Sequence, residues 1–172
     1  STGSGGCYGN TTLNTQDFGI LSDGSGANDY CNNQNCTWLI QPPGATSVSL
    51  NFTSFSLEEA SSDGQSIYDA VEVYDGATVN APLLGRFSGN SLPPMVTSTS
   101  GSLLVRFYSD VSVTDSGWTA YYTSTSAQHC TQNNVLSTAS GNIVDGSGSN
   151  LYANNSDCSW LIQPQGANKI TL

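Results

Sequence analysis

An internal repeat constrains this chain more than any other feature of its sequence. Residues 36–50 and 158–172 align without a gap at an offset of 122 residues, and nine of the fifteen positions are identical. The Asp-Gly-Ser-Gly motif that begins at Asp23 recurs at Asp145 with the same offset. Solenoid repeats have periods of roughly 20–50 residues. A period this much longer predicts tandem domains instead.

The repeat also sets the expected domain boundaries. A Ser/Thr-rich link at residues 123–128 separates the copies, which predicts a complete domain at residues 1–127 and the N-terminal part of a second at residues 128–172. The second copy ends at Leu172, the counterpart of Leu50. About 43 residues are too few to bury a core alone. We therefore expect the sequence to be an excised piece of a longer protein.

Apolar and polar residues alternate in short runs, and this pattern predicts strands. Val48, Leu50 and Phe52, for example, occupy every second position of one run. Gly, Pro and Asn separate the runs, and no stretch has helical periodicity over more than a turn. Short strands at this spacing favour an all-β, two-sheet antiparallel sandwich, with a partial second sandwich after the link. The expected strands are residues 38–40, 47–55, 70–74, 83–87, 95–98, 103–108 and 117–122.

The charge balance excludes several classes of partner. Lys and Arg number 3 against 13 Asp and Glu, for a net charge of −10. An acidic surface repels nucleic acid and anionic lipid, so divalent cations or basic proteins are the expected partners. No apolar run approaches the ~20 residues that span a bilayer, so membrane insertion is not expected.

Cysteine and asparagine patterns indicate a secreted protein. The chain has 5 Cys and no Cys-x-x-Cys metal pattern, which favours an oxidising, extracellular compartment. Asn-x-Ser/Thr sequons are frequent by chance in a chain rich in these residues. They would carry N-glycans only if the source glycosylates, at Asn10, Asn35, Asn51 and Asn154.

A series of motifs in a fixed order resembles the CUB domain family. The resemblance covers Cys7 to Tyr122 nearly end to end, and Cys130 to Leu172 as a truncated copy. Each motif alone is weak, but their order over more than a hundred residues is highly specific. It implies a two-sheet antiparallel sandwich of jelly-roll type. The motifs are Cys7, Tyr30-x-Asn32-Asn33, Cys36-x-Trp38-x-Ile40, Phe55-Ser56-Leu57-Glu58, residues 68–76, residues 82–87, residues 103–112 and Gly117-Trp118-x-Ala120-Tyr121-Tyr122.

The resemblance implies one disulfide in each copy, Cys7–Cys36 and Cys130–Cys158. The family's second disulfide is absent, because its two positions hold Ser66 and Ser88. Cys31 stands where the second copy has Ala153, so the family pattern gives it no disulfide partner. One expectation is that it forms a covalent link between chains.

The resemblance also implies a calcium site. Many CUB domains hold Ca²⁺ with a Glu, two Asp and a backbone carbonyl near a final Ser, which here are Glu58, Asp69, Asp110 and Ser112. Ca²⁺ takes six to eight hard oxygen ligands, and carboxylates supply them. In the family such a site also offers a carboxylate oxygen to a partner's Lys or Arg. The alternative is three unrelated carboxylates on an acidic surface.

No pattern in the sequence predicts catalysis. The single His, His129, directly follows the link and precedes Cys130. The Gly-x-Ser-x-Gly, His-Glu-x-x-His and phosphate-loop motifs are missing from the sequence. We therefore expect a non-catalytic, extracellular, calcium-binding module for protein interaction or adhesion. We expect identical copies as partners in a tandem-domain fibre or filament. The alternative is an accessory CUB domain of a secreted protease or other secreted enzyme.

Overall fold

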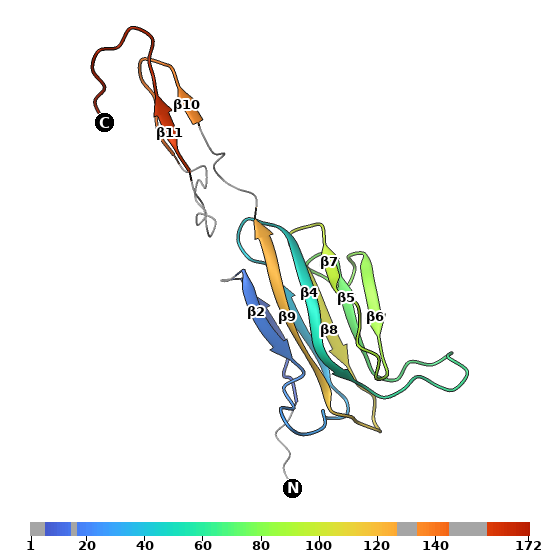
Figure 1. The fold of residues 1–172 in the computed structure, drawn as a ribbon. Coiled ribbons are helices and arrows are strands. Elements are labelled where there is room, and N and C mark those ends of the chain that lie inside the picture. The colour runs from blue at the N-terminus through green and yellow to red at the C-terminus, as the bar shows by residue number, and fades with distance from the viewer. Residues whose placement is uncertain (1–5, 15–16, 127–133, 145–157) are drawn as a thin grey trace. The chain divides into compact units, whose positions relative to one another are not determined.

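The computed structural model describes residues 6–14, 17–126, 134–144 and 158–172. The chain divides into two compact units, Ser1–Thr125 and Ser126–Leu172 (Figure 1). Each unit is described separately below. None of the described residues forms a helix long and apolar enough to cross a membrane.

Nine strands build the described part of the first unit as two sheets (Figure 1). The five-stranded sheet has the order β1-β3-β8-β5-β6, and the four-stranded sheet has the order β2-β9-β4-β7. The predicted two-sheet sandwich is therefore confirmed. The strands are β1 Asn10–Leu13, β2 Phe18–Ser22, β3 Asn35–Ile40, β4 Ala45–Ser56, β5 Ala70–Tyr74, β6 Leu83–Phe87, β7 Val96–Ser98, β8 Leu103–Tyr108 and β9 Gly117–Ser126.

The apolar residues at every second position of a strand point into the core between the sheets. In β4, Val48, Leu50 and Phe52 are buried, while the intervening Ser47, Ser49 and Asn51 are only partly covered. Buried aromatic rings join the two layers: Trp38 on β3 meets Trp118 on β9 edge to face at 5.1 Å. Edge-to-face packing adds to the stabilisation that burial of the ring area provides.

Two edge strands, β1 and β2, were not predicted from the sequence. Three of the four residues of β1 are exposed. In β2 the exposed residues Phe18 and Ile20 are as apolar as the buried Leu21, so apolar and polar residues do not alternate along it. β1 also differs in direction, because it pairs with β3 in parallel. The pairs β2–β9, β3–β8, β4–β7, β5–β6 and β5–β8 are antiparallel. The parallel β1 is added at this edge of an otherwise antiparallel-rich sandwich, where the Cys7–Cys36 disulfide holds the chain before β1 beside β3.

A charged cluster lies on the five-stranded sheet. Glu72 on β5 is 2% exposed. Arg86 on β6 approaches it at 2.7 Å and Arg106 on β8 at 3.1 Å. Tyr74 donates a hydrogen bond to the same carboxylate. Burial opposes ionisation, but these hydrogen bonds and the two positive charges outweigh it and lower the pKa of Glu72.

The second unit contains one strand pair among its described residues. Strands β10 Asn134–Leu136 and β11 Trp160–Ile162 pair in parallel. Apolar side chains that follow the pair are exposed, including Ile170 at 49% and Leu172 at 96%. The predicted partial second sandwich, with its boundary at residues 127/128, stays a prediction.

Candidate metal centre

Three strand ends bring three carboxylates together. Glu58 lies two residues after β4, Asp69 directly precedes β5, and Asp110 lies two residues after β8. Because β5 and β8 are antiparallel with Ala70 opposite Tyr108, the start of one lies beside the end of the other. Each carboxylate offers one oxygen, and these oxygens lie within 4.8 Å of one another. The structure thus brings together all three of the carboxylates that the resemblance singled out.

Asp69 forms the buried floor of the cluster. Its side chain has no exposed surface. The Tyr30 hydroxyl donates to Oδ2 at 2.5 Å, and the backbone N–H of Asp110 donates to Oδ1 at 2.8 Å. Both oxygens are thereby held in place, and each retains lone-pair capacity for a further interaction.

Tyr30 links two of the carboxylate residues, and sequence reasoning missed this role. Its hydroxyl donates to Asp69 and accepts a hydrogen bond from the backbone N–H of Glu58 at 3.0 Å. The ring is fully buried and packs edge to face on Phe107 at 5.3 Å. The sequence analysis placed Tyr30 only among the family motifs. That motif membership was the available signal, since 39 residues separate Tyr30 from Asp69.

The backbone of Glu58 is fixed from the neighbouring loop. Its carbonyl accepts hydrogen bonds from the Ser88 hydroxyl at 2.9 Å and from the Gly89 N–H at 3.2 Å. Gly89 has φ +71°, and a Cβ there would lie 2.7 Å from a carboxylate oxygen of Glu59. Ser88, which replaces a family cysteine, therefore contributes a hydrogen bond to the site.

The electrostatics of the metal-free cluster disfavour its negative charge. Burial raises the pKa of Glu58, and the nearby charges of Asp110 and Asp69 raise it further. Burial also raises the pKa of Asp69, although hydrogen bonds from Tyr30 and from the Asp110 backbone oppose the shift. Burial and the hydrogen bond to Asp69 raise the pKa of Tyr30, so its hydroxyl stays protonated.

One oxygen in the cluster has no partner. Glu58 Oε2 is buried, and no described residue donates a hydrogen bond to it. An unpaired buried acceptor costs about 1–3 kcal/mol, and more when it is charged. A cation among the three carboxylates would supply the missing interaction. Hard oxygen donors carrying up to three negative charges suit Ca²⁺.

Ser112 lies beside the cluster, and the contribution of its backbone carbonyl as a ligand stays a prediction. Its backbone N–H donates to Asp110 Oδ1 at 2.8 Å, which orients that carboxylate. The next residue, Val113, has φ +56°, a conformation that is unusual for a β-branched residue. Val113 and Glu58 also line an open cleft of about 360 Å³ together with Glu59 and Asp115.

The remaining predicted residues fall in several environments. Cys7 and Cys36 form a disulfide with a Cα–Cα separation of 6.1 Å. Cys31 is half-buried, and its carbonyl accepts a hydrogen bond from the Ser109 hydroxyl at 2.7 Å. Cys130 lies outside the described residues, so the Cys130–Cys158 pairing stays a prediction.

The sequons differ in their surroundings. Asn10 and Asn35 are exposed. Asn51 is half-buried and donates a hydrogen bond to the Tyr121 hydroxyl at 3.0 Å. Asn154 lies outside the described residues.

Comparisons with known proteins identify relatives of this fold. The model of the CUB domain family matches residues 7–122. Cubilin of Sus scrofa is 36% identical over 160 residues, which cover 92% of this chain and 4% of that protein. Zinc metalloproteinase nas-39 of Caenorhabditis elegans is 38% identical over 139 residues, or 79% of this chain and 14% of that protein. The chain thus spans a small fraction of these curated relatives.

Among solved structures, the full extracellular region of zebrafish Gpr126/Adgrg6 is similar with a TM-score of 0.58. The sequences are 30% identical, and the match covers 70% of this chain and 15% of that one.

Proposed function

The chain belongs to the CUB domain family, and we propose that it acts as a non-catalytic, calcium-stabilised module for protein interaction outside the cell. Family membership supports the role of an extracellular interaction module. The solved zebrafish relative is itself an extracellular region. The calcium dependence and the identity of the partner are the further steps of the proposal.

The unpartnered oxygen of Glu58 carries the calcium proposal. It lies in a cluster whose three carboxylate oxygens are within 4.8 Å, and burial and mutual repulsion raise the pKa of Glu58 and Asp69. A protein with no use for this arrangement would bear its cost without compensation. Glu58, Asp69 and Asp110 would hold Ca²⁺, with Ser112 and water as the expected source of further oxygens.

Calcium would act here by joining strand ends. The residues after β4 and β8 and before β5 have no ladder hydrogen bonds to one another at the cluster. A bound cation would neutralise the carboxylates and hold both sheets at this end of the sandwich. The stability added by a ligand that binds only the folded state grows as RT ln(1 + [L]/Kd).

The expected partner carries exposed Lys or Arg. Arg86 and Arg106 are the only Lys or Arg residues of the first unit, and both pair with Glu72. The unit therefore has many acidic groups and no basic side chain left to balance them, which favours a basic partner. Glu58, Glu59 and Asp115 line an open cleft beside the cluster and add to its negative potential.

Identical copies are the proposed source of assembly. The tandem repeat supports a role as a unit of a longer array, in which copies of the module are linked along one fibre or filament. The alternative, an accessory domain of a secreted protease, is favoured by the similarity to the metalloproteinase nas-39.

Binding of the chain to immobilised poly-L-lysine, with CaCl₂ or EDTA at matched ionic strength, tests this function. Simple attraction to an acidic chain would weaken when Ca²⁺ neutralises the cluster. A calcium-organised docking site predicts the opposite: Ca²⁺ strengthens binding, and Asp69→Asn removes the calcium effect. Binding that is unchanged or weakened by Ca²⁺ would rule out the proposed docking role.

A further inference from the structure

The outer face of the four-stranded sheet carries no charge. Strands β2, β9, β4 and β7 form this layer (Figure 1) and contain no Asp, Glu, Lys or Arg, although the sequence has 13 acidic residues. In β4, Val48 and Leu50 point into the core, so the alternate residues Ser49 and Asn51 face outward. This face therefore suits a neutral ligand.

An open, mostly apolar hollow lies on this face. It has a volume of about 340 Å³, within the range of small-molecule sites. Phe18 and Ile20 in its lining are 53% and 69% exposed, and the Phe18 ring lies 6.1 Å from the ring of Tyr121, centroid to centroid. Large apolar side chains that are exposed together mark interaction sites, whereas single ones need no explanation. The hollow is lined by Phe18, Ile20, Thr53, Thr119, Ala120 and Tyr121.

The sequon of Asn51 borders the hollow. Asn51 and Thr53 are its first and third residues, so both point outward from β4, while Phe52 between them is buried. Thr53 itself lines the hollow. The side-chain nitrogen of Asn51, the atom to which an N-glycan is attached, lies 3.0 Å from the hydroxyl of Tyr121, which also lines the hollow. A sugar on Asn51 would therefore begin beside the hollow.

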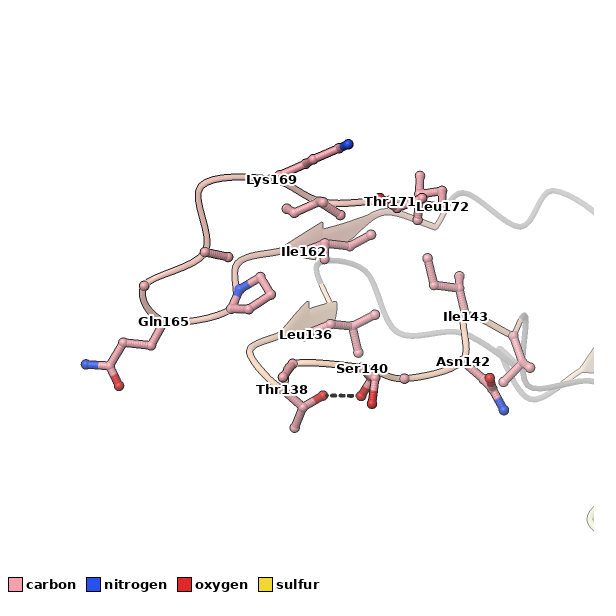
Figure 2. Close-up of a pocket in the computed structure, with 17 residues that line it drawn as sticks. Leu136, Thr138, Ser140, Asn142, Ile143, Ile162, Gln165, Lys169, Thr171 and Leu172 are labelled. Atoms are coloured by element: carbon pink, nitrogen blue, oxygen red, sulfur yellow. Dashed lines mark hydrogen bonds between the residues drawn. The ribbon is translucent and has the colours of Figure 1, made fainter.

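A larger groove in the second unit lacks this combination. It has a volume of about 1010 Å³, and Figure 2 shows Leu136 and Ile162 on the strand pair that borders it. Among the described residues, its lining includes the charged Lys169 and no residue of an Asn-x-Ser/Thr sequon. The hollow on the four-stranded sheet has an uncharged lining and a sequon as part of it.

We propose that Asn51 is N-glycosylated and that the first N-acetylglucosamine of its glycan occupies the hollow. The apolar C–H face of the sugar ring packs against the rings of Phe18 and Tyr121. Covalent attachment gives the sugar a high effective concentration beside the hollow, so weak packing is enough to hold it there. The inference is independent of the calcium site and of the proposed assembly.

The sugar donor for this transfer is a lipid-linked diphospho-oligosaccharide. The side-chain nitrogen of Asn51 forms a bond to C1 of the N-acetylglucosamine that is attached to the diphosphate, and the nitrogen loses one proton. The bond between C1 and the diphosphate oxygen breaks, and the lipid diphosphate leaves with the electron pair of that bond. One N–H remains on the nitrogen and still donates to the Tyr121 hydroxyl. Because Asn51 is half-buried in the folded sheet, the transfer takes place on the unfolded chain.

An occupied hollow would close this part of the surface to protein partners. The sugar covers the exposed side chains of Phe18 and Ile20. Glu58, Asp69 and Asp110 are not among the residues that line the hollow, so the glycan leaves the carboxylate cluster open.

Nuclear Overhauser contacts between the sugar and the two aromatic rings test the proposal directly. The full 172-residue chain is secreted from mammalian cells that make only high-mannose glycans, and an endoglycosidase trims each glycan to one N-acetylglucosamine. Peptide mass spectrometry should find Asn51 occupied, and the protons of its sugar should contact the ring protons of Phe18 and Tyr121. An empty Asn51, or an occupied Asn51 whose sugar contacts neither ring, would overturn the proposal.

Thermal unfolding of the trimmed protein gives a second measurement. The wild type should unfold about 2–4 °C higher than Asn51→Gln, which keeps an amide but accepts no sugar, a shift typical of a small stabilisation in a chain of this size. The difference should vanish when both proteins also carry Phe18→Ser, which removes one wall of the hollow and leaves the sequon intact. An equal difference with and without Phe18→Ser would overturn the proposal.

Asn10→Gln is the matched control, because Asn10 lies on β1 of the five-stranded sheet, where the Thr37 hydroxyl donates to it. Its effect on thermal unfolding should be the same with and without Phe18→Ser. Sedimentation at increasing concentration tests a competing occupant of the hollow. Association of the trimmed wild type that Phe18→Ser abolishes would overturn the proposal, because a second copy would then fill the hollow.

Discussion

The Tyr30 hydroxyl donates a 2.5 Å hydrogen bond to Asp69, whose side chain is completely buried at the start of β5. The same hydroxyl accepts from the backbone N–H of Glu58. One phenol therefore sets the relative positions of two of the three carboxylates. The cluster is built by a buried ring and by strand ends, so hydrogen bonds from elsewhere in the fold hold two of its carboxylates in place.

Tyr30→Phe should weaken calcium binding while leaving all three carboxylates in the chain. The variant removes the donor to Asp69 and the acceptor for Glu58. Loss of such a supporting hydrogen bond typically lowers metal affinity by about 10–100-fold. It should also reduce the free energy of unfolding by about 1–3 kcal/mol, because buried polar atoms lose their partners. Calcium titration and urea unfolding in EDTA measure the two effects.

Tyr121→Phe is the matched control. Tyr121 and its hydrogen-bond donor Asn51 both lie on the four-stranded sheet, and neither belongs to the carboxylate cluster. It should leave calcium affinity unchanged. Equal calcium affinity in the wild type and Tyr30→Phe would show that Tyr30 does not organise the site.

Glu58→Gln should stabilise the metal-free protein at neutral pH. The raised pKa of Glu58 means that the folded state keeps its proton to higher pH than the unfolded chain. The metal-free free energy of unfolding therefore falls as pH rises from the ordinary carboxyl pKa, about 4.3, through the raised value. Glu58→Gln cannot ionise, so its free energy of unfolding does not fall in this way. In EDTA the variant should therefore be more stable than the wild type above this pH range and equally stable below it.

With CaCl₂ the wild type should be the more stable of the two proteins, because the ion binds the Glu58 carboxylate that Glu58→Gln lacks. Urea unfolding from pH 3 to pH 8, with EDTA or CaCl₂, compares both proteins with Glu59→Gln, whose carboxylate is an exposed neighbour. A variant that is less stable than the wild type in EDTA at pH 7 would contradict the repulsive cluster.

Glu72→Gln should destabilise the first unit by about 1–2 kcal/mol at pH 7. The substitution removes the negative charge that Arg86 and Arg106 share. Hydrogen bonds to charged groups contribute about 1.5–3 kcal/mol, and the partial exposure of both arginines, 46% and 32%, reduces that figure.

The pKa of Glu72 is lowered in the folded state. The stability that Glu72 contributes is therefore present above the ordinary carboxyl pKa and is lost as pH falls through the lowered value. The difference between wild type and variant, measured by urea unfolding, should close in acid. A difference that persists at pH 2 would assign the effect to packing instead of charge.

Two glycines with nearly the same backbone conformation should respond differently to alanine. Gly64 has φ +70° and open space around it, whereas a Cβ on Gly101, at φ +73°, would overlap the backbone oxygen of Ala45. Gly64→Ala should cost about 1–2 kcal/mol, the usual penalty of the left-handed conformation. Gly101→Ala should cost clearly more, because a backbone atom at the start of β4 must also move. Thermal unfolding of the two variants gives the comparison, and equal losses would contradict the overlap.

Particular residues show how far sequence could predict this structure. Residues 70–74, 83–87 and 103–108 were predicted as strands, and β5, β6 and β8 have these bounds, because polar or turn residues mark both ends of each run. β1 and β2 lie at sheet edges, where several of their side chains are exposed. Apolar and polar residues do not alternate along either strand, so the sequence did not predict them.

The site was predictable only in part. Glu58, Asp69 and Asp110 were named through the family resemblance, since no local pattern links residues so far apart. The role of Tyr30 and the unpartnered Glu58 oxygen depend on contacts between residues far apart in the chain. These contacts could not be predicted from the sequence alone.

Isothermal titration calorimetry of the full chain with CaCl₂ measures whether Glu58, Asp69 and Asp110 form a calcium site. We expect one Ca²⁺ per chain in the wild type and in Asp63→Asn, whose carboxylate lies in an exposed loop outside the cluster. Asp69→Asn, which keeps the size of the side chain, should lose more than about 100-fold in affinity, because a charged ligand of the site is gone. If the wild type binds no calcium, or if Asp69→Asn binds it equally well, the three carboxylates are not a calcium site.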